Sequence, residues 1–292
     1  MYQENFVYGQ ALGAGLLADI ESPDGDGPFP VILSVHGGRW IAGDRRDTSA
    51  IGVSQWAGFG YFALSIDYRY LTCTPAPACY QDLLCAIRWV HALEYHLDLD
   101  RFYLIGQSAG GHMVSLAATL GDGRFDRVGG WEDQDNAVTA AISVAAPYDL
   151  TTLDWGCAWL PPGEPCGQAR SYASPQEHVS AASKPLLIIH SDDDRSVPIL
   201  QALNMVETMK QASAKHEFVH YTDLGHMQIT DEIIAQSRGF IDRLEAWGKI
   251  QSEVDQDWAS VKKYLMRVMW IEAIHDGPGE AVWRDLERTI SS

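Results

Sequence analysis

The sequence predicts an α/β protein with a mainly parallel central sheet and helices on both faces of that sheet. Three observations carry this prediction. Apolar runs of the length of one buried strand recur along the chain, and they alternate with runs whose apolar residues have helical spacing. A strand, a helix and the next strand form a βαβ unit, and repetition of that unit gives a parallel sheet. With 46% hydrophobic and 21% charged residues the composition is that of a soluble globular protein, and α/β folds of 292 residues are routinely single domains.

The individual elements follow from these patterns in chain order. Leu12–Ile20 alternates loosely and ends before a turn rich in Gly, Pro and Asp. In Gln81–Leu93 the apolar residues return at helical spacing, and Asp231–Trp247 is strongly amphipathic. The predicted strands are Leu12–Ile20, Val31–Val35, Phe62–Tyr68, Phe102–Ile105, Val138–Ala145, Leu186–His190 and His216–Tyr221. The predicted helices are Gln81–Leu93, Met113–Leu120, Ile199–Ala212 and Asp231–Trp247.

The regular pattern breaks down between residues 147 and 184. This stretch is rich in Trp, Pro and Cys and shows few periodic runs. A long irregular insertion in a compact domain is usually functional. We therefore expect residues 147–184 to form a lid or substrate-binding insertion, with Trp155 and Trp159 as walls of a pocket. The alternative is that both indoles fill space in the core.

A tail follows the last amphipathic helix. We expect residues 1–248 to form the α/β domain and residues 249–292 a helical extension, because apolar residues between Val254 and Ile271 repeat at helical spacing. Such a stripe must be buried against something. It packs either on the domain or on another subunit, so a homo-oligomer formed through this extension is one of two expectations.

The charge and the cysteines exclude several classes of partner and cofactor. A formal net charge of -18 argues against nucleic acid or an anionic membrane as a partner. The first residues lack the basic and apolar regions of an export signal, and no apolar run is long enough to span a bilayer, so we expect a cytoplasmic protein.

Without a C-x-x-C motif, zinc is not expected. The five cysteines are expected to be reduced, although Cys73 with Cys79 and Cys157 with Cys166 are placed where loop disulfides could form.

The segment Phe102 to His112 carries the main functional motif. Its apolar run leads into the sequence G-Q-S-A-G at Gly106–Gly110, and a helix-compatible run follows at once. A G-x-S-x-G sequence between a strand and a helix is typical of a nucleophile elbow, in which a strained turn exposes the serine above the sheet. We therefore expect Ser108 to be a catalytic nucleophile. The alternative is that this short string occurs by chance.

A serine hydroxyl is a poor nucleophile at neutral pH, so Ser108 needs a base nearby and the base needs an orienting acid. Of the ten histidines, His226 is favoured because it lies on a short loop between the last strand and the last helix, at the carboxyl edge of the sheet. The alternative positions are His112, which follows the serine on its helix, and His190, at a strand end. We expect the remaining histidines to be surface or core residues.

The orienting acid is expected on the loop after Leu186–His190. This loop holds three consecutive aspartates, Asp192, Asp193 and Asp194, so that chemistry alone leaves the acid ambiguous. Asp194 is favoured because it comes just before the point where the chain turns into a helix. The other two could bond to the local backbone, as Asp commonly does in such loops.

A second glycine motif ends the strand Val31–Val35. It reads His-Gly-Gly-Arg-Trp over residues 36–40. The adjacent Gly37 and Gly38 would allow backbone N–H groups to point into a cavity without a Cβ in the way, which an oxyanion site requires. The alternative is a plain turn that ends a strand.

As a set, these motifs resemble those of α/β-hydrolases of the carboxylesterase type, similar to hormone-sensitive-lipase-like esterases and to feruloyl and acetyl-xylan esterase-like hydrolases. The match covers about Leu12 to Trp247. The resemblance implies that Asp194 is the acid of the triad. Arg39 stands where many relatives have a third glycine, and the tail after Gly248 has no counterpart. The motifs in the family's order are His36–Trp40, Asp67–Arg69, Gly106–Gly111, Asp192–Pro198 and Leu224–His226.

The resemblance implies a hydrolase of carboxylic esters with small to medium acyl or aryl groups. Ser108 would form an acyl-enzyme, with His226 as base and Asp194 holding the imidazole. The N–H group of Ala109, with those of Gly37 and Gly38, would form the oxyanion hole. No metal or organic cofactor is needed for this chemistry.

Aromatic residues suggest where a substrate would bind. Trp40, Trp155 and Trp159 would suit an aryl or apolar acyl group, although aromatic walls line many pockets.

Two other functions remain as alternatives. One is an amidase of the arylformamidase type on the same fold. The other is a non-enzymatic binding protein, against which the intact set of Ser, Asp, His and glycines argues.

Overall fold

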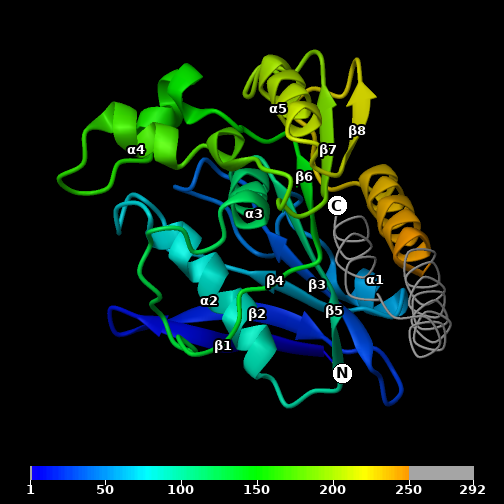
Figure 1. The fold of residues 1–292 in the computed structure, drawn as a ribbon. Coiled ribbons are helices and arrows are strands. Elements are labelled where there is room, and N and C mark those ends of the chain that lie inside the picture. Colours follow the sequence, from blue (N-terminus) through cyan, green and yellow to red (C-terminus); the bar gives the residue numbers. More distant parts are fainter. Residues whose placement is uncertain (1, 250–292) are drawn as a thin grey trace, which may run out of the picture. The chain divides into compact units, whose positions relative to one another are not determined.

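The computed structural model describes residues 2–249 (Figure 1). The chain divides into two compact units, Met1–Ser237 and Arg238–Ser292. The first unit contains the sheet and the candidate site, and residues 238–249 of the second unit are helical. Apart from its first residue, the predicted extension 249–292 lies outside the described residues, as does its expected role in oligomers. The predicted domain boundary after residue 248 stays a prediction.

An eight-stranded sheet runs through the first unit in the order β1-β2-β4-β3-β5-β6-β7-β8. β1 and β2 are antiparallel to each other, and β2 is antiparallel to β4. All neighbouring pairs from β4 to β8 are parallel. The predicted α/β class with a mainly parallel sheet is thus confirmed. The strands are β1 Tyr2–Ala11, β2 Ala14–Glu21, β3 Phe29–Val35, β4 Phe62–Ile66, β5 Leu97–Gln107, β6 Ala140–Val144, β7 Leu186–Ser191 and β8 His216–Tyr221.

The structure differs from the prediction at the start of the chain. Leu12 and Gly13 lie in the hairpin turn between β1 and β2, with φ angles of 51° and 81°, so β2 begins at Ala14 rather than at Leu12. The apolar pattern does not predict β1 at all. Only Tyr8 and Gly9 of β1 are buried, and an edge strand that exposes most of its side chains carries little alternation to detect.

Helices flank the sheet, and the three longest of those between residues 53 and 211 correspond to predicted ones. α1 and α4 have no counterpart among the predictions, because six or seven residues are too few to display helical spacing. Residues 231–249 are also helical. In the described part of the chain, no helix is both long and apolar enough to cross a membrane. The helices are α1 Val53–Gly58, α2 Ala78–Ala92, α3 Ala109–Thr119, α4 Cys166–Tyr172 and α5 Leu200–Gln211.

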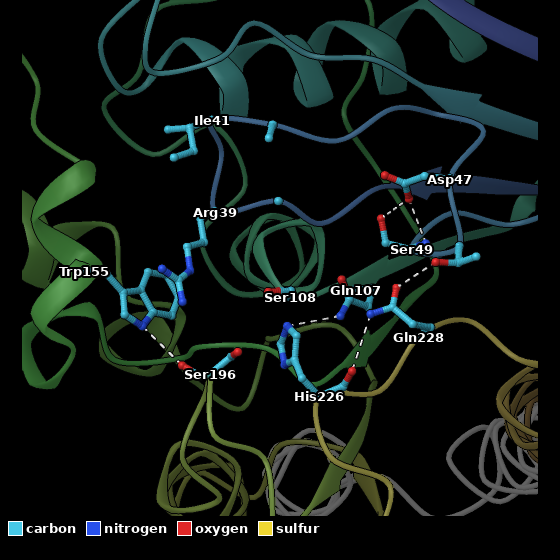
Figure 2. A pocket seen from close by; sticks show the side chains of 13 residues that line it. Arg39, Ile41, Asp47, Ser49, Gln107, Ser108, Trp155, Ser196, His226 and Gln228 are labelled. Atoms are coloured by element: carbon cyan, nitrogen blue, oxygen red, sulfur yellow. Dashed lines mark hydrogen bonds between the residues drawn. The ribbon is translucent and has the colours of Figure 1, made fainter.

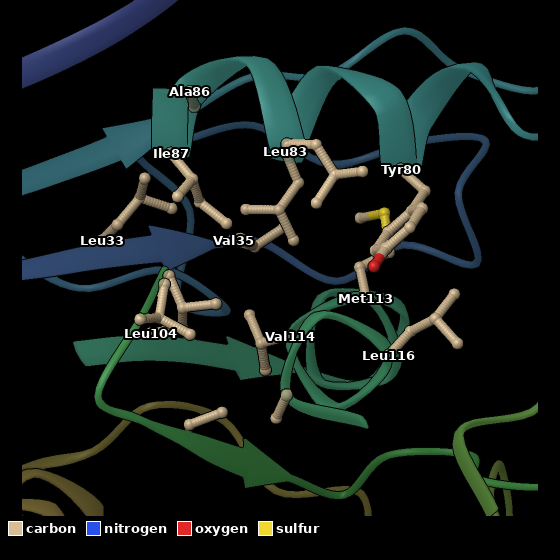
Figure 3. Close-up of a cluster of buried hydrophobic side chains, with 14 of the residues drawn as sticks. Leu33, Val35, Tyr80, Leu83, Ala86, Ile87, Leu104, Met113, Val114 and Leu116 are labelled. Carbon is tan, nitrogen blue, oxygen red and sulfur yellow. The ribbon is translucent and has the colours of Figure 1, made fainter. Parts of the chain in front are cut away.

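The main hydrophobic core lies where α2 and α3 pack on the central strands (Figure 3). Leu83 and Ile87 of α2 face Leu33 and Val35 of β3 in this cluster. Successive side chains of a strand point to opposite faces of the sheet, so Ile32 points to the other side, where it is equally buried. Both faces are therefore covered, as parallel sheets require.

The predicted insertion at residues 147–184 consists of short helical turns and α4. Arg170 of α4 ties these turns together, because its guanidinium donates to the carbonyl oxygens of Leu150 and Leu153 at 2.7 and 3.0 Å. The Sγ atoms of Cys157 and Cys166 lie 3.8 Å apart, and all five cysteines of the chain are free thiols. The 3₁₀ turns are η1 Leu150–Thr152, η2 Asp154–Ala158 and η3 Pro175–His178.

The parallel strands place the predicted site residues at one edge of the sheet. β3 is followed by the His36–Trp40 motif, and β5 is followed directly by Ser108. The loops after β7 and β8 carry Asp194 and His226. Because the carboxyl ends of parallel strands meet at the same edge, segments far apart in the sequence come together there.

Candidate active site

Ser108 occupies a sharp turn between β5 and α3. Its φ of 52° and ψ of -115° lie outside the regions that L-residues ordinarily adopt, so the backbone is strained at this residue. The Ser108 N–H donates to the carbonyl oxygen of Val144 at 2.8 Å, which anchors the turn to β6. The predicted sequence of strand, sharp turn and helix is present.

The two glycines of the G-x-S-x-G motif allow this turn to pack. A Cβ added to Gly106 would lie 2.4 Å from the backbone of Gly110. A Cβ added to Gly110 would lie 2.0 Å from the carbonyl oxygen of Val35, at the end of β3. Neither position has room for a side chain, because α3 begins in direct contact with its own strand and with the neighbouring one.

His226 and Asp194 form a hydrogen-bonded pair. The His226 Nδ1 atom lies 2.8 Å from the Oδ2 atom of Asp194. The other carboxylate oxygen accepts the backbone N–H groups of Ser196 and Val197 at 2.8 and 2.9 Å, and the side chain of Asp194 is fully buried. A carboxylate held this way orients the imidazole with Nδ1 as the donor, which makes Nε2 the nitrogen that can accept a proton.

The two neighbouring aspartates have other partners. Asp192 contacts the exposed His220, with 2.6 Å between Oδ1 and Nε2. Asp193 accepts the Ser191 hydroxyl and the Gly225 N–H, both at 2.7 Å. These two hydrogen bonds lower the pKa of Asp193. Asp193 therefore shapes the loop that carries His226, and among the three aspartates it is Asp194 that contacts the imidazole.

Gln107, which the sequence motifs do not single out, contacts the other side of this histidine. Its Nε2 atom donates to the carbonyl oxygen of Met227 at 2.7 Å and lies 3.3 Å from Nε2 of His226. Figure 2 shows the imidazole extending toward Gln107 and Ser108. No sequence signal could have found Gln107. It occupies an x position of the G-x-S-x-G motif, and its contacts with His226 and Met227 arise only in the folded chain.

The backbone donors near Ser108 differ in their availability. The Gly37 N–H donates to the Ser49 hydroxyl at 2.9 Å, so it is already satisfied, which departs from the expectation that it binds an oxyanion. The Gly38 N–H has no hydrogen-bond acceptor within the described residues. Ala109 is the first residue of α3, and the first N–H groups of a helix have no acceptor inside it. Gly38 and Ala109 are therefore the available donors among the three predicted ones.

A cavity of about 460 Å³ brings these groups together. Ser108, Gln107 and His226 line its middle part. Figure 2 shows Arg39, Ile41 and Trp155 on one side of them, and Asp47, Ser49 and Gln228 on the other. One end of the cavity thus combines an aromatic ring with a cation, and the other end is lined by groups that form hydrogen bonds.

Of the three tryptophans predicted to bind substrate, Trp155 lines the cavity and the other two do not. Trp40 and Trp159 are fully buried. Their ring centroids are 5.5 Å apart, and that of Trp155 is 5.6 Å from Trp40. The two buried indoles form a layer behind the cavity wall. The alternative that Trp155 and Trp159 both fill space in the core therefore fits Trp159 and does not fit Trp155.

His112 and His190, the two alternatives to His226 as the base, do not line the cavity that contains Ser108. His112 is fully buried, burial lowers its pKa to about 4, and its Nε2 atom lies 2.7 Å from the carbonyl oxygen of Ala173 in the insertion. His190 is fully buried, and its Nε2 atom lies 2.9 Å from the carbonyl oxygen of Val197 and 3.6 Å from Oδ2 of Asp194. Burial lowers the pKa of His190 as well. Both histidines are neutral packing residues that hold the surrounding loops.

Comparison with known proteins adds a family match. A family model described as BD-FAE matches residues 18–209. The chain is 32% identical over 247 residues to LipM, a probable carboxylic ester hydrolase of Mycobacterium tuberculosis, a match that covers 79% of this chain and 56% of that protein. It is 29% identical over 225 residues to a probable isoprenylcysteine alpha-carbonyl methylesterase of Arabidopsis thaliana, covering 70% of this chain and 46% of that protein. The chain spans about half the length of the curated relatives it matches.

Solved structures share the fold. A truncated carbohydrate esterase from gut microbiota superimposes with a TM-score of 0.74 at 21% identity, covering 84% of this chain and 96% of that one. A thermophilic esterase of Thermogutta terrifontis superimposes with a TM-score of 0.66 at 24% identity, covering 86% of this chain and 92% of that one. At these identities the likeness establishes the α/β-hydrolase fold of the chain.

Proposed function

We propose that this chain, which belongs to the BD-FAE family of α/β-hydrolase esterases, hydrolyses carboxylic esters of small to medium acyl or aryl groups. The observation that carries the proposal is the meeting of two distant segments in one cavity, one of them held by a third. Ser108 on its strained turn and His226, held by the buried Asp194, line the same 460 Å³ space. The names of the related proteins support ester hydrolysis as the reaction.

In the proposed mechanism Ser108 is the nucleophile. His226 accepts the Ser108 proton through Nε2 as the hydroxyl oxygen attacks the ester carbonyl, and it then protonates the leaving alcohol. Asp194 stabilises the imidazolium that forms in between. Water hydrolyses the resulting acyl-enzyme by the same steps in reverse order, with His226 as the base.

The oxyanion of each tetrahedral intermediate is bound by the N–H groups of Ala109 and Gly38. Removal of one oxyanion donor from a serine hydrolase typically lowers kcat about 10²- to 10³-fold, so two such donors contribute much of the rate. Gly37 has a different role in this proposal. Its N–H holds the Ser49 hydroxyl, and its lack of a side chain makes room for Gln107, whose Oε1 atom would lie 2.1 Å from a Cβ at this position.

The test is turnover of p-nitrophenyl esters of increasing acyl length, with Ser108→Ala as the matched blank. We expect wild-type protein to release p-nitrophenol from short esters and the variant to show no rate above the background. Circular dichroism and the thermal midpoint of the variant establish that its fold is intact. Undiminished turnover by a folded Ser108→Ala variant would rule out the proposal, and an N-formyl amide in the same panel tests the amidase alternative.

A further inference from the structure

Arg39 is the cationic side chain that lines the cavity beside Ser108. It is exposed, and its guanidinium carbon lies 5.4 Å from the ring centroid of Trp155. Within the described residues it forms no ion pair with a carboxylate, in contrast to arginines such as Arg45 and Arg69, which pair with Asp19 and Asp82. The charge of Arg39 is therefore not used to hold the fold together.

The backbone at Arg39 is unfavourable for any residue except glycine. Arg39 has a φ of 53° and the following Trp40 a φ of 61°, both in the left-handed region. A residue with a Cβ pays a conformational penalty there that glycine avoids. Strained residues beside a candidate site are candidates for a functional role. Packing of the buried Trp40 side chain accounts for the strain at Trp40, but no comparable packing accounts for the strain at the exposed Arg39.

The position of the guanidinium indicates the chemistry of a ligand. Its central carbon lies over the ring of Trp155, which is a cation–π contact. Within the described residues the guanidinium donates no hydrogen bond, and a planar fork of N–H donors matches the two oxygens of a carboxylate. The aromatic ring beside it would pack against an apolar or aryl portion of the same molecule.

The opposite end of the cavity would not accept an anion. Asp47 lines that end, and its carboxylate already accepts the Ser49 N–H at 2.8 Å and the Asp44 N–H at 3.1 Å. A second carboxylate placed there would meet a like charge. An anionic substrate can therefore bind in one direction, with its charge at Arg39 and its ester bond between the two ends, beside Ser108 (Figure 2).

We propose that Arg39 binds a carboxylate on the substrate, so that the chain prefers esters that carry a negatively charged group on their acyl or alcohol part. This inference rests on the proposed ester hydrolysis. It adds the class of substrate, and it assigns a binding role to a residue outside the Ser108, His226 and Asp194 set.

The experiment compares two pairs of esters whose members differ at one end, where one member carries a carboxylate and the other its uncharged methyl ester. The acyl pair is mono-p-nitrophenyl glutarate and its methyl ester, and the alcohol pair is p-acetoxybenzoate and its methyl ester. For each pair the ratio of kcat/KM, anionic over neutral, is measured for wild-type protein and for Arg39→Gln, Arg39→Lys and Arg39→Gly. We expect Arg39→Gln to lower this ratio about tenfold or more in one pair, because a charge-assisted hydrogen bond is lost, and Arg39→Lys to restore part of it.

Arg195→Gln is the matched control. Arg195 is exposed and precedes the loop segment Ser196–Val197, but it does not line the cavity. Its substitution removes the same charge from the same edge of the sheet, so we expect its ratio to stay near the wild-type value. The Arg39→Gly variant removes the side chain and relieves the backbone strain, so its ratio reports on binding even if Arg39→Gln folds poorly.

The outcomes separate this inference from the function on which it rests. A ratio that falls in Arg39→Gln and Arg39→Gly but not in Arg195→Gln supports carboxylate binding, and the responding pair shows which part of the ester carries the charge. Equal ratios in all proteins, with neutral esters still hydrolysed, overturn the role of Arg39 and leave the esterase proposal standing. Absence of turnover of every ester by wild-type protein overturns both.

Discussion

At the level of single residues, the candidate site depends on hydrogen bonds that fix orientation. The carboxylate of Asp194 accepts from two backbone N–H groups and from His226 Nδ1, so it cannot rotate away from the imidazole without losing them. Gln107 contacts the opposite nitrogen of the same ring. The imidazole is thus held from both sides in front of Ser108.

Substitution of Asp194 by asparagine tests this arrangement. We expect Asp194→Asn to lower kcat for p-nitrophenyl esters by about 10³- to 10⁴-fold, because an amide no longer holds the imidazole in the productive tautomer or stabilises its charged form. Asp192→Asn is the matched control, since it removes the same charge from the same loop. Steady-state kinetics on the two variants should show the large loss in Asp194→Asn alone, and an equal loss in Asp192→Asn would contradict the assignment.

The sequence predicts some site residues and leaves others open for a physical reason. Ser108 and His226 follow from the residue types that flank them and from their places between strand and helix. The three aspartates are alike in residue type, so Asp194 is favoured only by its place before the helix and by the family resemblance. In the structure it is the direction of the backbone that brings Asp194, and not its two neighbours, to His226. That Gly37 is paired with Ser49 depends on a contact between residues twelve positions apart, for which no motif exists.

At the level of elements, the close approach of α3 to β3 is what places Ser108. Gly110 lies in the first turn of α3, where an added Cβ would meet the carbonyl oxygen of Val35 at 2.0 Å. Backbone atoms cannot give way as a flexible side chain can. Any side chain at this position must push the helix, and with it the nucleophile turn, away from the sheet.

Gly110→Ala should therefore destabilise the protein. We expect a loss of about 2 kcal/mol or more in the free energy of unfolding, measured by urea denaturation, together with lower ester turnover. Gly167→Ala is the matched control, because Gly167 lies in α4 with nothing within 4 Å of an added Cβ. That variant should be neutral or slightly more stable, since alanine favours helix. Equal stability of the two variants would argue against the tight contact.

A cluster of charges joins β2 to the loop after β3. Asp19 of β2 is 3% exposed and accepts hydrogen bonds from Arg45, Arg46 and the Asn5 N–H. Burial by itself raises the pKa of Asp19, but these hydrogen bonds outweigh it and lower the pKa from 3.8 to about 2. Because the pKa is lower in the folded than in the unfolded state, the carboxylate stabilises the fold above about pH 4, and this contribution disappears as the pH falls toward 2.

Asp19→Asn should remove this pH dependence. At neutral pH we expect the free energy of unfolding to fall by roughly 2 kcal/mol, the equivalent of the pKa shift. Between about pH 4 and pH 2 the stability of the variant should decline less steeply than that of wild-type protein. Denaturation curves across this range measure both effects, with Asp24→Asn, in an exposed turn, as the control. Parallel pH profiles of wild type and Asp19→Asn would show that the cluster contributes nothing.

The elements that the sequence predicts are those with a strong apolar pattern. The helices α2 and α5 and the strands β3, β4, β6 and β7 are found within about three residues of their predicted bounds. β5 begins at Leu97 rather than at Phe102, because its first five residues are not buried and show no apolar run, and α3 begins at Ala109, four residues before its predicted start. β1 escapes prediction because most of its side chains are exposed, and Leu12 lies in a turn that its apolar side chain does not reveal. α1 and α4 are shorter than the window in which helical spacing can be recognised.

At the level of the whole chain, the order of the strands brings the loops of the candidate site together. The sheet order places β3, β5, β7 and β8 with their carboxyl ends at one edge. The loops that follow these strands are far apart in the sequence, since about 190 residues separate His36 from His226. The mainly parallel class is predictable from alternating patterns. The cavity is not predictable from these patterns, because its cationic, aromatic end and its hydrogen-bonding end form only when these loops meet.

Trapping of the acyl-enzyme shows whether Ser108 is the nucleophile without the use of a variant. A rapid-mixing experiment with p-nitrophenyl acetate follows the release of p-nitrophenol, and acid quenching followed by peptide mass spectrometry locates the acetyl group. We expect a burst of p-nitrophenol and an acetyl group on the peptide that contains Ser108, and specifically on that serine. Hydrolysis without any acylated serine, or with the acetyl group on another residue, would contradict this role of Ser108.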